Sequence, residues 1–105
     1  MSFEKNIAID KAKRFVALLN ANGINVQEAY LFGSAALEQA DEYSDIDVAI
    51  VSDNFAGIPF YDVKKISKFR RAVDLRLEVH PFSLKEIQFS PSTFFLDIKR
   101  EGFLL

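Results

Sequence analysis

Hydrophobic and polar positions change period along the chain, and the changes predict alternating helices and strands. Apolar residues recur near the helical period over 4–21, and the Asn22-Gly23 pair follows as a stop signal. The segment 27–32 has the composition of a strand and leads into Gly33, whose missing Cβ permits a tight turn or the close approach of a ligand. Ser34–Gln39 then resembles a short helix.

The second half of the chain continues this alternation. Segment 45–51 is rich in β-branched residues and predicts a strand with Ile46 on one face and both Asp45 and Asp47 on the other. Pro59 can open a helix that runs to about Arg71. Strict alternation over 73–80 predicts a third strand with a polar face. A Ser83/Glu86 capping box and the Ser90-Pro91 pair indicate the final helices.

This order of elements restricts the topology. A helix joins the second and third strands, so a right-handed crossover should make them parallel, with their starting ends together. The short connection after the first strand favours an antiparallel pairing with the second. We therefore expect one domain over 1–105, an α/β (α+β) fold with a small mixed sheet flanked by helices. Five residues should converge at one edge of that sheet: Gly33, Ser34, Asp45, Asp47 and Asp74.

Composition narrows the class of protein. Half of the 105 residues are hydrophobic, eleven are Phe and none is Cys, so the chain should bury one core, and we expect any metal to be bound by oxygen ligands. The start of the chain lacks a signal-peptide apolar region, and no run of about 18 apolar residues could span a membrane. We expect a cytoplasmic protein. A formal charge of −2 argues against binding to duplex nucleic acid.

Asp45 and Asp47 supply the candidate metal chemistry. Residues i and i+2 of a strand project from one face, so these carboxylates can hold one or two hard cations, for which Mg²⁺ is the expected ion. Ser34, behind Gly33, can offer its hydroxyl and nearby backbone N–H groups to the phosphates of a nucleoside triphosphate. Together these features favour nucleotidyl transfer, in which a hydroxyl attacks the α-phosphorus and pyrophosphate leaves.

The third carboxylate is a choice between Asp74 and Glu78, which share a face of the predicted third strand. About 13 Å would separate them in an extended strand, too far for both to join one metal cluster. We predict Asp74 because it lies nearer the start of that strand. His80, the single histidine, precedes a proline at a strand end, which favours a structural role over a catalytic one.

The spacing Gly33-Ser34, ten residues, then Asp45-Ile46-Asp47, with a later acid at Asp74, resembles the minimal nucleotidyltransferase family of the DNA polymerase β superfamily. The resemblance extends over nearly the whole chain. It implies triphosphate and Mg²⁺ binding at Gly33-Ser34, metal ligation by Asp45, Asp47 and Asp74, and ATP or another nucleoside triphosphate as substrate. Members of the family often pair with a helical HEPN-domain protein and act as antitoxins that transfer AMP onto it.

Two departures from the family pattern keep alternatives open. Ala35 replaces a basic residue that often follows Gly-Ser, and Glu38 replaces a second glycine. The sequence therefore also fits an antitoxin that is inactive or weakly active and neutralises a partner by contact. Transfer to a small molecule such as an aminoglycoside is a further alternative, and the oligomeric state, a homo-oligomer included, is open. Lys64, Lys68 and Arg71 form a basic helix face that suits solvent or an acidic partner.

Overall fold

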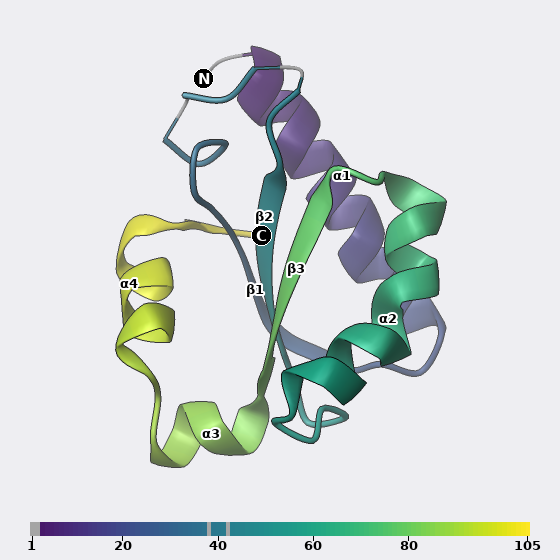
Figure 1. Ribbon diagram of the computed structural model, residues 1–105, viewed down its shortest axis with the longest axis vertical. Helices are drawn as coiled ribbons and strands as arrows, with labels where there is room; N and C mark the ends of the chain where they lie inside the picture. Colours follow the sequence, from purple (N-terminus) through teal and green to yellow (C-terminus); the bar gives the residue numbers. More distant parts are fainter. Residues whose placement is uncertain (1–2, 38, 42) are drawn as a thin grey trace.

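The structure, a computed structural model, describes residues 3–37, 39–41 and 43–105 (Figure 1). Four strands form one mixed sheet in the order β3-β2-β1-β4, and helices flank it on both sides, as the sequence predicted. The elements in chain order are α1 (Phe3–Ala21), β1 (Val26–Phe32), β2 (Ile46–Ser52), α2 (Pro59–Val73), β3 (Leu77–Ser83), α3 (Leu84–Phe89), α4 (Thr93–Glu101) and β4 (Phe103–Leu104).

The strand directions agree with the expected topology. β1 pairs antiparallel with β2, and Phe32 lies opposite Asp47. β2 pairs parallel with β3, so that Asp47 lies opposite Glu78. β4 adds a short antiparallel partner to β1. The end of β1 and the starts of β2 and β3 therefore meet at one edge of the sheet.

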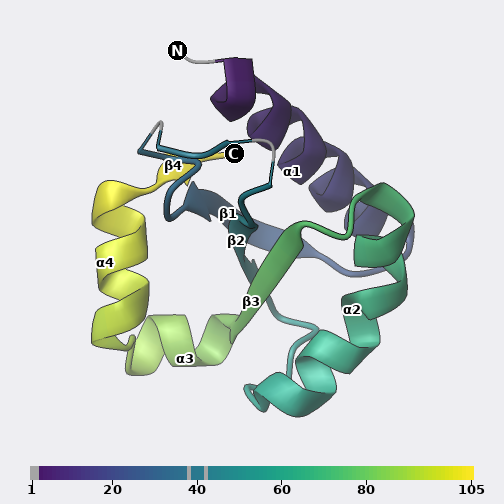
Figure 2. The ribbon, with the colours of Figure 1, turned by 45° about the horizontal axis from the view of Figure 1, so that its top comes forward.

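Helices cover both faces of the sheet (Figure 2), and an apolar cluster lies on each face. Helices α1 and α2 cover one face, where Phe15 and Ile66 pack against side chains such as Val48. The shorter α3 and α4 lie on the other face, where Phe95 and Ile98 pack against Tyr30. Because strand side chains alternate, Ile46 and Asp47 point to opposite faces, as predicted. Asp47 lies on the α4 face.

Two predictions of secondary structure are wrong: the short helix after Gly33 and the start of the third strand. Residues 34–37 form turns rather than a helix, with the N–H of Leu37 donating to Gly33 O (3.3 Å) and that of Gln39 to Ser34 O (2.9 Å). The equally short α3 begins with a capping box of Ser83 and Glu86, whereas Ser34 is followed three residues later by Leu37, which cannot complete such a box. The third strand begins at Leu77 rather than Val73, because α2 continues through Val73 and a turn follows it.

The turn after α2 explains why alternation misplaced that strand. Leu75, read as a buried strand position, is 70% exposed. Arg70 Nη1 donates to the carbonyl oxygens of Leu75 (3.0 Å) and Leu77 (3.3 Å), which holds the chain in the turn. The predicted Ser83/Glu86 capping box is confirmed at the start of α3. Within the described part of the chain, no helix combines the length and apolar character needed to cross a membrane.

Candidate active site

Two carboxylates and an imidazole gather where β2 and β3 begin. Asp47 and Glu78 are direct neighbours across the parallel pair, and His80 follows Glu78 on the same face of the sheet. One potential ligand atom from each of the three lies within 4.8 Å of the other two. His80 Nε2 is 3.5 Å from Asp47 Oδ1 and 3.9 Å from Glu78 Oε1. Among the described residues, no other set of three acids or histidines comes together in this way.

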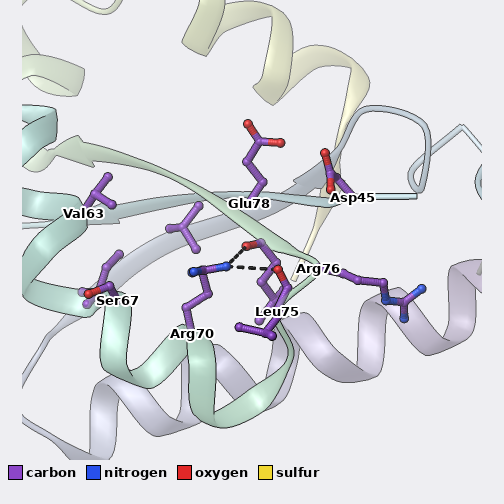
Figure 3. A pocket seen from close by; sticks show the side chains of 10 residues that line it. Asp45, Val63, Ser67, Arg70, Leu75, Arg76 and Glu78 are labelled. Atoms are coloured by element: carbon purple, nitrogen blue, oxygen red, sulfur yellow. Dashed lines mark hydrogen bonds between the residues drawn. The ribbon is translucent and has the colours of Figure 1, made fainter. Parts of the chain in front are cut away.

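Asp45 adds a third carboxylate at the same edge. It immediately precedes β2, and its carboxylate is near enough to Glu78 to interact with it electrostatically. In Figure 3, Asp45 and Glu78 point to the same side of β3, whereas Arg70 lies on the opposite side. The negative charge of Asp47 raises the pKa of Glu78, with smaller contributions from desolvation and from Asp45, while His80 opposes the shift. The negative charges gathered at this edge repel one another, and a bound cation would reduce that repulsion.

The turn after β1 passes directly against Asp47. Gly33 has a φ of +71°, and a Cβ at this position would lie 2.5 Å from Asp47 Oδ2. Only glycine therefore allows the backbone to follow this path without displacing the carboxylate. The path brings Ser34, the next residue, to the edge where Asp47 lies. The predicted convergence of Gly33, Ser34, Asp45 and Asp47 agrees with this geometry.

The structure does not bring Asp74 to this group. Asp74 caps the end of α2, where its carboxylate accepts a hydrogen bond from the N–H of Arg76 (2.8 Å). The same carboxylate lies 3.7 Å from Lys11 Nζ and 3.5 Å from Arg76 Nε. The expectation that Asp74 occupies the start of a strand is wrong because β3 begins three residues later. Glu78, the alternative carboxylate, is the acid that the strand start places beside Asp47.

His80 is the member of the group that sequence reasoning interpreted as structural. Its ring makes edge contacts with the rings of Phe32 and Phe94, at centroid distances of 5.1 and 5.7 Å. The only signal in the sequence was its position two residues after Glu78, on the polar face of a strand. Because the sequence analysis assigned the third metal-binding acid to Asp74, the position of His80 beside Glu78 did not indicate a functional site.

The donors fit a divalent cation. Carboxylate oxygens are the ligands that Mg²⁺ and Mn²⁺ take in proteins, and Asp47 and Glu78 supply them from neighbouring strands. His80 Nε2 is buried and has no hydrogen-bond partner among the described residues, so an atom able to bind a cation is left unsatisfied. Burying such a nitrogen without a partner is unfavourable. A cation among the three side chains would remove that cost and offset the carboxylate repulsion.

Two hollows adjoin this edge. One of about 350 Å³ has Asp45 and Glu78 in its wall and extends between α2 and β3, past Val63, Ser67 and Arg70 (Figure 3). The other, of about 210 Å³, lies beside Gly33 and is mainly apolar. Its walls come from the turn after β1 and from α4: Phe32, Gly33, Ala36, Leu37, Phe94, Asp97, Ile98 and Glu101. Of the two hollows, the smaller one is next to the turn after β1.

Comparison with known families decides the class of protein. The model of the nucleotidyltransferase domain matches residues 9–100, which include the Gly33-Ser34 turn and the acids of β2 and β3. The chain belongs to the nucleotidyltransferase domain family. The family supports nucleotidyl transfer as the general activity of this chain. A comparison with curated proteins gives no significant match.

A solved structure supports the fold of this nucleotidyltransferase domain. The chain is similar to a protein described as "a putative nucleotidyltransferase from Sulfolobus solfataricus", with a TM-score of 0.70. The similarity covers 96% of this chain and 81% of that chain, at 20% sequence identity. At this identity the likeness establishes the fold.

Proposed function

We propose that this nucleotidyltransferase domain transfers a nucleoside monophosphate, AMP from ATP in the first instance, onto an acceptor hydroxyl with the help of Mg²⁺ or a similar divalent ion. The observation that supports this most directly is the register of β2 and β3, which sets Asp47 beside Glu78. Asp45, whose charge acts on Glu78, adds a third carboxylate, and Asp47 lies directly against the turn at Gly33.

Asp45, Asp47 and Glu78 would hold the cation in this proposal, with Glu78 in place of Asp74. When bound, the cation neutralises triphosphate charge and lowers the pKa of the attacking hydroxyl. Ser34 would donate its hydroxyl to a phosphate oxygen, as sites built on a glycine turn commonly do. The hydroxyl oxygen forms a bond to the α-phosphorus of the triphosphate. The bond between the α-phosphorus and the oxygen that bridges it to the β-phosphorus breaks, and pyrophosphate leaves. The proton released from the hydroxyl would pass to a carboxylate oxygen of the site or to water.

The departures from the family pattern have a partial structural account. Ala35 is 1% exposed and packs in the core on the α1 face of the sheet. A basic side chain at this position would have to be buried, which is unfavourable for a charge without a partner. Glu38 lies outside the described residues. Ala35 is therefore compatible with an active site that binds triphosphate through the turn backbone, Ser34 and the cation.

The acceptor is proposed to be a hydroxyl on a helical partner protein of the HEPN type, with the chain acting as its antitoxin. The proposal follows from the family resemblance, and the basic face of α2 offers a surface for an acidic partner. Lys64 and Lys68 are exposed on that helix, with Arg71 one turn further on. Two alternatives lead to different products: neutralisation by contact leaves the partner unmodified, and a small-molecule transferase modifies a compound such as an aminoglycoside.

Incubation with α-labelled ATP and Mg²⁺ tests the proposal. The chain alone, the chain with its helical partner and the chain with an aminoglycoside are compared for pyrophosphate release and transferred label. We expect label on the partner and a loss of at least about a hundredfold in rate in Asp47→Asn and Glu78→Gln. Asp53→Asn, an exposed acid at the far end of β2, is the matched control.

Asp74→Asn separates the two assignments of the third acid. The geometry predicts that this variant keeps most of the transfer rate, because Asp74 pairs with Lys11 and Arg76 instead of the site. A loss in Asp74→Asn with no loss in Glu78→Gln would contradict the assignment of Glu78. Neutralisation of an unlabelled partner would support action by contact and overturn transfer to the partner.

A further inference from the structure

His80 is held in a fixed position against the carboxylate pair. Its ring contacts Phe32 at the end of β1 and Phe94 in α4, so aromatic side chains from two elements restrict its rotation. Its Nε2 atom faces Asp47 and Glu78 at 3.5 and 3.9 Å. The side chain is 29% exposed, but Nε2 itself is shielded from solvent. The exposed part of the ring is therefore not the nitrogen that points at the acids.

That nitrogen makes no hydrogen bond with a described residue. The separations from the carboxylate oxygens exceed the usual N–H···O range of about 2.7–3.2 Å. The imidazole nitrogen and one oxygen of each carboxylate thus lie within 4.8 Å of one another, and the nitrogen is not hydrogen-bonded to either acid. A cation placed among them would bind two carboxylate oxygens and one imidazole nitrogen.

The chemistry of this donor set differs from that of an all-carboxylate site. Mg²⁺ is a hard cation that takes oxygen ligands and keeps several waters. Imidazole nitrogen suits the borderline cations, and affinity for nitrogen-containing sites rises from Mn²⁺ through Co²⁺. We propose that His80 Nε2 is a metal ligand together with Asp47 and Glu78, and that it makes the site prefer Mn²⁺ or Co²⁺ over Mg²⁺. This inference rests on the cation site of the proposed function.

The competing interpretation is a protonated His80 that only balances the charge of the two acids. In that case a cation would have to displace the imidazolium, and removing the histidine would strengthen the binding of every divalent ion alike. The two interpretations therefore predict opposite changes in one measured quantity, the affinity for Mn²⁺.

Calorimetric titration of Mg²⁺, Mn²⁺ and Co²⁺ into the chain, with no nucleotide present, is the first test. His80→Gln places an amide where the imidazole was and keeps an oxygen that Mg²⁺ accepts. We expect the affinity for Mn²⁺ and Co²⁺ to fall about tenfold or more and that for Mg²⁺ to change by less than about threefold. An unchanged ratio of Mn²⁺ to Mg²⁺ affinity, or tighter binding of all three ions, would overturn the proposal.

Nuclear magnetic resonance supplies a second test, and its main measurement is made on the natural chain. His80 is the only histidine in the chain, so one set of imidazole signals reports on it. Titration with diamagnetic Zn²⁺ should shift the Nε2 resonance to that of a metal-bound nitrogen, and Asp47→Asn should abolish the shift. Zn²⁺ binding that leaves Nε2 unchanged, or a chain that binds no divalent ion, would overturn the proposal.

The two proposals fail in distinguishable ways. Transfer of label that persists while His80→Gln leaves the ion preference unchanged would remove only the role of His80. A shifted Nε2 resonance in a chain that transfers no nucleotide to any acceptor would remove only the transferase proposal.

Discussion

At the scale of single residues, the site depends on Gly33 as much as on the acids. Its left-handed φ of +71° lets the turn pass Asp47, and the space for a Cβ is taken by Asp47 Oδ2. Gly23 has a similar φ of +83°, but no atom lies within 4 Å of the corresponding Cβ position. The two glycines thus share a conformational requirement and differ in what surrounds them.

The different surroundings of the two glycines predict that Gly33→Ala and Gly23→Ala will differ in their effect on metal binding. Each substitution should cost about 1–2 kcal/mol of unfolding free energy, because an L-residue is strained at positive φ. Only Gly33→Ala should also push the Asp47 carboxylate and weaken Mn²⁺ binding, by about tenfold. Urea unfolding and calorimetry measure the two effects. Equal Mn²⁺ affinities in the two variants would contradict the close approach at Gly33.

Tyr30 predicts a loss of stability at high pH. Burial, followed by its hydrogen bond to Glu28, raises the pKa of the Tyr30 hydroxyl from 10.0 to about 12. The unfolded chain then loses this proton before the folded chain does, so unfolding is favoured as pH rises. The contribution is fully present below pH 10 and is lost as pH rises toward 12.

Absorbance of tyrosinate during alkaline titration checks this prediction. One of the three tyrosines should ionise near pH 12, and Tyr30→Phe should remove that step. Urea unfolding of the same variant should depend less on pH between 10 and 12. A titration of Tyr30→Phe indistinguishable from that of the natural chain would show that another group carries the late step.

At the scale of elements, a buried carboxylate fixes the entry to α2. Asp62 is buried and accepts hydrogen bonds from the N–H groups of Ala56 (2.8 Å) and Gly57 (2.9 Å), one with each oxygen. The cap residue Ile58 makes no side-chain hydrogen bond, so Asp62 supplies the polar contact that joins the loop to the helix. The position of α2, and with it the wall of the hollow beside Glu78, depends on this loop.

Asp62→Asn should therefore destabilise the chain. One of the two N–H groups would face an amide donor instead of an acceptor, and a buried unpaired donor costs about 1–3 kcal/mol. Asp53→Asn, which removes an exposed carboxylate a few residues earlier, should change the unfolding free energy by less than about 0.5 kcal/mol. Urea midpoints compare the two, and equal midpoints would show that the Asp62 contacts contribute little.

The elements also show where sequence patterns suffice. The spacing of apolar residues predicted α1 and α2 nearly to their ends, and the β-branched residues predicted β2. Each of these elements is long enough for burial of its apolar side chains to outweigh local hydrogen bonds. Patterns failed over 34–37 and 73–76, where few residues are buried and hydrogen bonds determine the path of the backbone. In the second segment the contact of Arg70 with the carbonyls of Leu75 and Leu77 overrides an alternation that is typical of a strand.

At the scale of the whole molecule, cation binding should be coupled to folding. Asp47 and Glu78 lie in different strands and meet only through the β2–β3 pairing, so the unfolded chain has no comparable site. A ligand that binds only the folded state, at about 100 times its Kd, adds about 2.7 kcal/mol to the unfolding free energy.

Thermal unfolding with and without Mn²⁺ measures this coupling. We expect Tm to rise by an amount on the order of 10 °C at saturating Mn²⁺. The shift should vanish in a variant carrying both Asp47→Asn and Glu78→Gln and should persist in Asp74→Asn. A shift that survives the double substitution would place the cation elsewhere on the molecule.

The sequence by itself determined the type of fold, the parallel and antiparallel pairings and the Gly33-Ser34 turn beside Asp47. These follow from local patterns and from the constraint that a helix linking two strands makes them parallel. Only the tertiary structure decided which acid and which nitrogen join Asp47. Their identity depends on the residue at which β3 begins, because a shift in the strand start changes which side chains face Asp47. That start is set by the Arg70 and Asp74 contacts after α2, and it brings Glu78 and His80 to the site.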